Sequence, residues 1–122
     1  MVLPCDLSAA RLARTWVSGL LNPLSLTEAT FQDILLAVSE LVTNAVVHAD
    51  SAPTVSLTVD PDEICIQVQD SSELPPAIRE RNDQRGGWGL RLVEQVADQW
   101  GTTYMPNGDK VVWFTVSAAS RS

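Results

Sequence analysis

The chain has 122 residues and a formal net charge of −7, with fifteen acidic and eight basic side chains. An acidic chain has no electrostatic attraction for polyanions, so we expect no direct binding to nucleic acid. With 45% hydrophobic and 19% charged residues, the composition is that of one globular domain spanning residues 1–122. The single histidine and two distant cysteines, Cys5 and Cys65, cannot supply a Cys/His zinc site, and both thiols are expected to be reduced.

The N-terminal segment has no basic start followed by an apolar run, and no stretch of about 18 apolar residues stands out further on. The sequence therefore predicts a cytoplasmic protein that is neither secreted nor inserted in a membrane. Ser8 is placed to cap a first helix in which Leu12, Trp16 and Leu20 recur every four residues. Asn22-Pro23 should end that helix, because proline restricts the residue before it and lacks an N–H donor.

A second, longer helix is predicted from about Glu28 to His48. Its start carries the S-x-x-E spacing of a capping box, from Ser25 to Glu28. One side of the helix is marked by apolar residues at helical spacing: Phe31, Ile34, Leu35, Val38, Leu41, Val42, Ala45 and Val46.

From Thr54 the apolar period changes from 3.6 to 2, which predicts two antiparallel strands joined by a tight turn at Asp60-Pro61-Asp62. A long loop from Asp70 to Trp88 follows, and long loops in small domains are often functional. A third helix is expected directly after its glycines and should end at Gly101. A last hairpin should turn at Asn107-Gly108. This order predicts an α+β fold: a two-layer sandwich with helices on one face of a mixed, mostly antiparallel sheet.

A polar stripe runs along the otherwise apolar second helix. Glu40, Asn44 and His48 follow one another at intervals of four residues, so they lie close together around the helix axis. The stripe could be simply the solvent face of an amphipathic helix. Asparagine is a poor residue in the middle of a helix unless its amide has a partner, however, and a ligand or a metal ion would be such a partner.

Two further segments carry candidate binding residues. Asp70-Ser71-Ser72 stands where an apolar strand ends; the acid is either a turn former or an acceptor for an exocyclic amine, and the hydroxyls could hold a bridging water. Gly86-Gly87-Trp88-Gly89-Leu90 opens the third helix, where backbone N–H groups and the helix dipole favour an anion. The spacing matches neither the dinucleotide-binding glycine motif nor the P-loop.

Together, the ordered segments ELVTNAVVHA (residues 40–49), VQDSS (68–72) and RGGWGLRLVEQVADQWG (85–101) resemble the N-box and the two glycine boxes of the GHKL ATPase superfamily. Within it, the chain is most similar to the small bacterial anti-sigma-factor serine/threonine kinases and related actinobacterial regulators. The resemblance covers nearly the whole chain and implies the Bergerat fold, also known as the histidine kinase-like ATPase domain. It departs from the family's D-x-G pattern, because Ser72 stands in place of the glycine.

The resemblance also implies residue roles. Glu40 matches the catalytic glutamate that acts as general base or orients the attacking group. Asn44 matches the ligand of the Mg²⁺ that bridges the ATP phosphates, and Asp70 matches the residue that reads the adenine amino group. Gly87 and Gly89 match glycines whose amides face the triphosphate. The full set expected to contact the nucleotide is Asn44, Asp70, Ser72, Arg85, Gly87, Gly89, Leu90 and Thr115.

The roles of Thr115 and Arg85 in this set, and that of His48 outside it, stay open at the level of the sequence. Thr115 corresponds to a late-strand threonine near adenine. Arg85 belongs, with Arg79 and Arg81, to a basic loop that either reaches the γ-phosphate or a protein partner, or is merely solvated. His48 is expected to serve in packing rather than to carry a phosphoryl group.

The function implied by the resemblance is that of an ATP-binding and Mg²⁺-binding transcription regulator. It would be a protein serine/threonine kinase, a transferase that phosphorylates an anti-sigma factor antagonist and sequesters a sigma factor. The alternatives are a nucleotide-switched module, or a noncatalytic interaction module without phosphotransfer. A homodimer is also implied, for which Trp16, Leu20 and Leu21 of the first helix are a candidate apolar patch that would fit a core face equally well.

Overall fold

The computed structural model describes residues 1–48, 51–71 and 88–117. The elements are, in chain order, α1 (Ala9–Leu21), the 3-10 helix η1 (Asn22–Leu24), α2 (Glu28–His48), β1 (Thr54–Val59), β2 (Glu63–Asp70), α4 (Trp88–Val96), β3 (Gln99–Tyr104) and β4 (Lys110–Ser117). The predicted order of helices and strands and the α+β class are confirmed. The predicted long loop, including Ser72, Arg79, Arg81, Arg85, Gly86 and Gly87, lies almost entirely outside the described residues.

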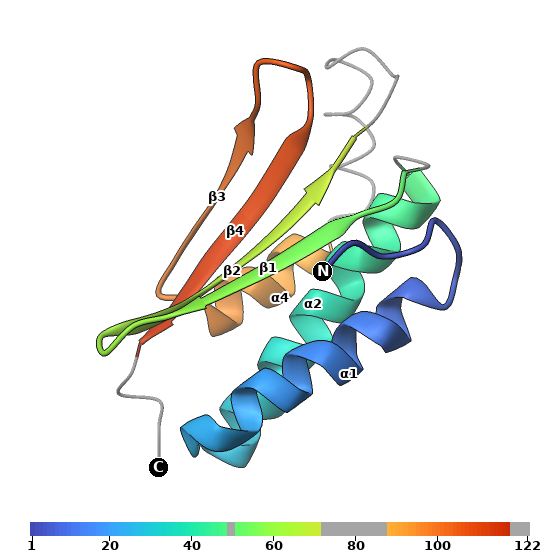
Figure 1. Ribbon diagram of the computed structural model, residues 1–122. Helices are drawn as coiled ribbons and strands as arrows, with labels where there is room; N and C mark the ends of the chain where they lie inside the picture. Colours follow the sequence, from blue (N-terminus) through green and yellow to red (C-terminus); the bar gives the residue numbers. More distant parts are fainter. Residues whose placement is uncertain (49–50, 72–87, 118–122) are drawn as a thin grey trace.

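The four described strands form one sheet in the order β1-β2-β4-β3, and every neighbouring pair is antiparallel. The described α-helices α1, α2 and α4 lie on one face of this sheet, as Figure 1 shows. α2 packs against both α1 and α4. The result is the two-layer arrangement that the sequence predicts, and all strand pairs in the described part of the chain are antiparallel rather than mixed.

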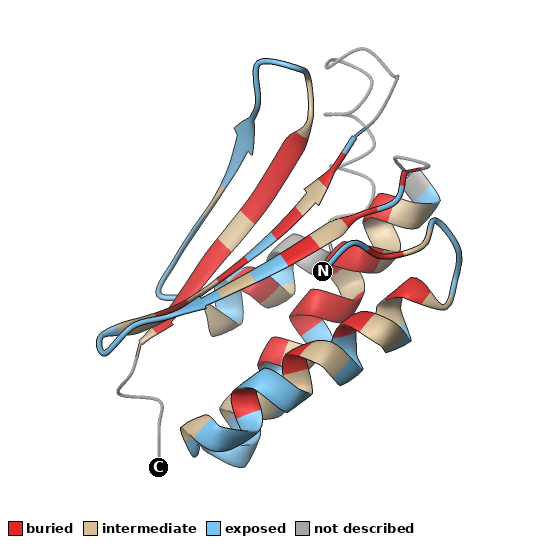
Figure 2. Cartoon of the chain, in the orientation of Figure 1, coloured by how far each residue is buried: buried red, intermediate tan, exposed pale blue. Residues whose placement is uncertain are grey.

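The hydrophobic core lies between the sheet and the helices. Alternate residues of β2, namely Ile64, Ile66 and Val68, point to the helices and are almost fully buried, as is Phe114 of β4. From the helical layer, Ile34 is also fully buried. Figure 2 shows buried positions along α1, α2, β2 and β4, whereas β3 at the sheet edge is mostly exposed.

Helix α1 begins where the sequence predicts, but its N-terminus is arranged differently. Ser8 is the N-cap residue, yet its side chain makes no capping hydrogen bond to the helix. Instead its backbone N–H donates to Asp6 Oδ1 at 2.8 Å, and its hydroxyl donates to the same oxygen. Both hydrogen bonds favour the carboxylate and lower the pKa of Asp6.

The predicted patch for dimerisation on α1 is only partly available. Leu21 is fully buried and Trp16 is half-buried, whereas Leu20 is 40% exposed. Leu21 is therefore a core residue, as the alternative interpretation of this apolar side allowed, and Leu20 is the one of the three that is mainly open to solvent.

Helix α2 has the predicted bounds but a different cap. The backbone N–H of Thr30 donates to Thr27 Oγ1 at 3.3 Å, and that of Phe31 donates to the Thr27 carbonyl. Ser25, by contrast, has a positive φ of 54° at the end of η1. The predicted capping box from Ser25 to Glu28 is therefore wrong, because Ser25 is the C-cap residue of η1 and the cap of α2 is Thr27, two residues later.

Between Glu28 and Val47, α2 is long and apolar enough to cross a membrane by length and composition alone, which corrects the expectation that no such stretch exists. In the fold, this apolar character is used for packing. Residues such as Val38 and Val42 are fully buried against the neighbouring elements. A core helix of a small domain can meet the same criteria of length and composition as a membrane-spanning helix.

The predicted third helix is shorter than expected. α4 ends at Val96, and the N–H of Asp98 already donates to the carbonyl of Thr115, which begins the pairing of β3 with β4. Gly101 thus lies inside β3 and does not end the helix. A Cβ added at Gly101 would lie 2.9 Å from Cζ2 of Trp113, so the glycine is required because the indole of the facing residue packs onto its backbone.

The hairpin turns and the cysteines agree with the predictions. β1 and β2 are joined by a turn in which Asp60 Oδ1 accepts from two backbone N–H groups, and Gly108 has φ +93° in the β3–β4 turn.

No disulfide joins Cys5 and Cys65. Burial, together with the nearby negative charge of Glu63 and Asp60, raises the pKa of the Cys65 thiol.

Candidate nucleotide-binding site

The polar stripe of α2 lies on a helix that packs against both α1 and α4. Glu40 and Asn44 are four residues apart and therefore lie on one side of α2. Both are half-buried, unlike the buried Leu41 and the exposed Val47. This is the burial expected of side chains that line a site, since they are partly covered by the fold and still reachable by a ligand.

Asp70 is the last residue of β2 and is nearly fully buried, with 4% exposure. It continues the row of Ile64, Ile66 and Val68, so its carboxylate lies on the helix-covered face of the sheet. The opposite residue on β4 is Lys110, also buried, whose Nζ lies 3.9 Å from Asp70 Oδ2. A buried charge requires such a partner, and the pair meets this requirement at the end of an apolar face.

Two side-chain hydrogen bonds hold this end of the sheet in place. The backbone N–H of Ser71 donates to Oγ of the buried Ser51 at 3.1 Å, which ties the end of β2 to the segment between α2 and β1. Gln69 Nε2 donates to Asp109 Oδ2 at 2.9 Å and fixes the start of β4. The ends of α2 and β2 and the start of β4 consequently lie at the same end of the molecule (Figure 1).

Helix α4 begins at Trp88, so Gly89 and Leu90 belong to its first turn as the sequence predicts. This first turn contains no acidic residue. The positive end of the helix dipole is therefore not neutralised from within the turn, a condition that favours anions. Because α4 packs against α2, its backbone and the Glu40–Asn44 stripe belong to the same helical layer.

Thr115 lies on β4 but does not share a face of the sheet with Asp70, and its place near the base stays a prediction. It pairs with Cys65, whereas Lys110, five positions earlier on β4, pairs with Asp70. Successive strand residues point to opposite faces, so Thr115 points away from the helices while Asp70 and Lys110 point toward them. Ser72, Arg85 and Gly87 lie outside the described residues, and the structure does not place them.

Lys110 is the residue that sequence reasoning missed. It is the single lysine of the chain, and from the sequence it merely follows a turn. The signal that could have found it is the register of the sheet. Once β2 and β4 are paired through their apolar residues, Lys110 must face Asp70.

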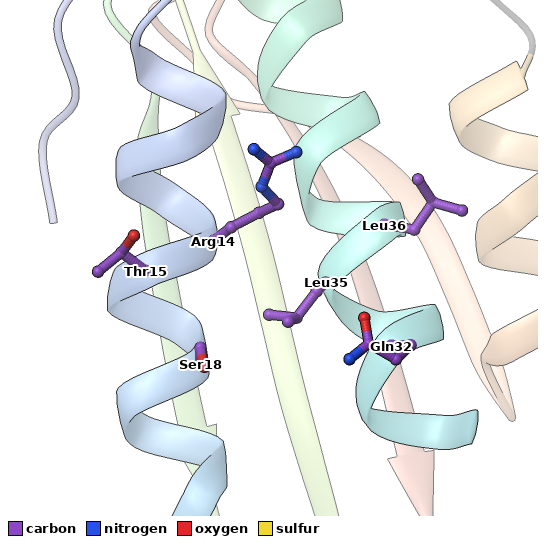
Figure 3. Close-up of a pocket in the computed structure, with 6 residues that line it drawn as sticks. All are labelled: Arg14, Thr15, Ser18, Gln32, Leu35 and Leu36. Carbon is purple, nitrogen blue, oxygen red and sulfur yellow. The ribbon is translucent and has the colours of Figure 1, made fainter. Parts of the chain in front are cut away.

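A hollow of about 530 Å³ lies between α1 and α2, away from these residues. Figure 3 shows Arg14 reaching from α1 toward α2, with Leu35 on the facing helix. Arg14 Nη1 donates to Ser39 Oγ at 3.3 Å. Neither Glu40 nor Asn44 lines this groove, so it is a feature separate from the predicted site.

Among the described residues, no group of three or more His, Cys, Asp or Glu side chains could hold a metal ion by itself. The amide oxygen of Asn44 and the carboxylate of Glu40 are hard oxygen donors of the kind that Mg²⁺ prefers. Mg²⁺ usually takes only one or two protein ligands when it is bound together with phosphates. The residues present therefore fit a Mg²⁺ ion that arrives with a nucleotide better than a permanently bound one.

The sequence matches the family model of the histidine kinase-like ATPase domain over residues 3–116. The chain therefore belongs to this family, which confirms the resemblance noted from the three motifs. None of the curated proteins matches the chain.

Among solved structures, the chain is similar to one in the crystal structure of the SiaB–SiaC complex from Pseudomonas aeruginosa. The TM-score is 0.63 at 12% sequence identity, covering 96% of this chain and 88% of the other. At this identity the likeness concerns the fold.

Proposed function

We propose that the protein is an ATP-binding regulator that transfers the γ-phosphoryl group of ATP to a serine or threonine of a partner protein. The observation that carries the proposal is the placement of the half-buried Glu40 and Asn44 on α2 and the buried Asp70 at the end of β2, within a histidine kinase-like ATPase fold. These groups are suited to the two ends of a nucleotide. A buried carboxylate can accept a hydrogen bond from the base of the nucleotide. An amide oxygen with a nearby carboxylate can act at the phosphates as a ligand for Mg²⁺.

The roles of the residues follow from their chemistry. Asp70 accepts a hydrogen bond from the 6-amino group of adenine, and the first turn of α4 offers backbone N–H groups to the phosphates. Asn44 supplies an oxygen ligand to Mg²⁺, which when bound neutralises phosphate charge that a chain of net charge −7 cannot offset broadly. Glu40 accepts the proton of the attacking hydroxyl or orients it, because phosphoryl transfer needs mainly positioning and electrostatic stabilisation.

We further propose that the phosphorylated partner is an anti-sigma factor antagonist, and that the protein acts in the cytoplasm as a homodimer which can also hold a sigma factor. The support is the family membership and the similar fold of a chain in the SiaB–SiaC complex, a complex between two proteins. The net charge of −7 agrees with control through protein contacts rather than through DNA.

Thermal unfolding with and without Mg·ATP tests the nucleotide part of the proposal. A ligand that binds only the native state should stabilise it by about 2.7 kcal/mol at a hundredfold excess over Kd. The wild-type protein should show this rise in Tm, and Asn44→Ala should lose most of it. Gln32→Ala is a matched control, because it removes an amide from the same helix at the separate α1–α2 groove. No rise in the wild-type Tm at millimolar Mg·ATP would contradict the proposal.

A further inference from the structure

Lys110 is an unusual residue for its position. It is the first residue of β4, faces the helices and is only 9% exposed as a whole residue. Lysine is rarely buried unless its ammonium group has a partner, and here the Asp70 carboxylate lies 3.9 Å away. Tyr104 of β3 continues the same row on the other side of Lys110. Asp70, Lys110 and Tyr104, three residues with polar ends, thus lie side by side on neighbouring strands at the end of an otherwise apolar face.

Stability alone does not explain a lysine here. A buried ion pair often contributes no more to stability than a well-packed apolar pair of similar volume would. What the pair does supply is a hydrogen-bond donor next to an acceptor on one face. The 3.9 Å separation of Nζ and Oδ2 is longer than a hydrogen bond, so the two groups attract each other as an ion pair. The ammonium has three donors and the carboxylate has several acceptor sites.

Adenine presents the complementary pattern. Its 6-amino group is a donor and is flanked by ring nitrogens that are acceptors, N7 on one edge and N1 on the other. An acceptor that binds the amino group and a donor beside it would bind both atoms of one edge. In a 6-oxo purine the 6-position carries an acceptor instead, which would face the carboxylate unfavourably.

We propose that Lys110 is a second base-recognising residue, whose ammonium donates to the ring nitrogen beside the 6-amino group that Asp70 binds. The inference rests on the proposed nucleotide-binding function and deepens it. Asp70 alone reads a single donor on the base. With Lys110 the site reads a donor and an acceptor together, which makes Lys110 a determinant of the specificity for adenine.

The test compares the affinities of ATP, 1-deaza-ATP and 7-deaza-ATP, each with Mg²⁺, for the wild-type protein and for Lys110→Met and Lys110→Arg. A hydrogen bond to a charged group corresponds to roughly a tenfold to hundredfold change in affinity. The wild type should lose this factor for one of the two analogues, and the identity of that analogue shows which edge of the base is read. Lys110→Met should bind ATP more weakly and no longer discriminate against that analogue. Lys110→Arg retains a donor and should keep some discrimination.

Equal affinity of the wild type for all three nucleotides would overturn the inference without the use of any variant. Discrimination that persists in Lys110→Met would overturn it as well. If Lys110→Met does not fold, the comparison of the three nucleotides on the wild type still tests the inference, because it needs no variant. A wild type that binds none of the nucleotides contradicts the proposed function itself, and this result is distinct from binding all three equally.

Discussion

Replacement of Glu40 by glutamine is expected to lower the rate of phosphoryl transfer by about 10²–10⁴-fold, the usual contribution of a general base. Glutamine keeps the size and the acceptor oxygen of the side chain but cannot take up the proton of the attacking hydroxyl. Because Glu40 is half-buried and Asn44 and Asp70 remain unchanged, the affinity for Mg·ATP should stay close to that of the wild type. Transfer is measured with γ-labelled ATP and a candidate antagonist protein, and affinity is measured by the Mg·ATP-dependent rise in Tm.

Glu94→Gln is the matched control for this experiment, since Glu94 is an exposed glutamate on α4. It should leave both transfer and affinity unchanged. Transfer at the wild-type rate in Glu40→Gln would remove Glu40 from the role of base. A wild type that binds Mg·ATP and transfers nothing to any antagonist would instead favour a nucleotide-switched binding module.

The second large effect concerns stability. Lys110→Met is expected to lower the free energy of unfolding by about 3–5 kcal/mol, because it leaves the Asp70 carboxylate buried without its cation. Methionine keeps much of the length and apolar volume of the lysine stem, so lost packing should contribute little. Chemical denaturation at neutral pH, with equal m-values in both proteins, measures the difference.

The double variant Asp70→Asn/Lys110→Met separates the charge effect from other causes. It removes the buried charge as well as its partner and should recover a large part of the stability that the single variant loses. If Lys110→Met costs less than about 1 kcal/mol, the range of an exposed ion pair, the pair is not the desolvated interaction described above. A double variant no more stable than the single one would show that the loss arises from packing.

The sequence predicted the fold well where local patterns are strong. The change of period at Thr54, the length of α2 and the Asn107-Gly108 turn were sufficient for the element order and for the α+β class. The errors lie at helix ends. Trp100 and Gly101 look like the end of a helix, but pairing with β4 draws them into β3, and local sequence contains no information about that partner strand.

The same distinction applies to the candidate site. Glu40 and Asn44 could be placed together because helical spacing is local, and Asp70 could be placed at a strand end. The faces of Thr115 and Lys110 could not be assigned from the sequence, since only the register between β2 and β4 decides which of them shares a face with Asp70. The register between distant strands depends on the packing of the whole core, so it cannot be predicted from sequence motifs alone.

Mapping backbone amide changes by NMR on addition of Mg·ATP tests the central claim most directly, because it locates the site as well as detecting binding. We predict that the changes concentrate on Glu40–Asn44 of α2, on Asp70 and Lys110, and on the first turn of α4. Changes centred on the α1–α2 groove around Arg14 and Gln32, or no changes at millimolar Mg·ATP, would contradict the account.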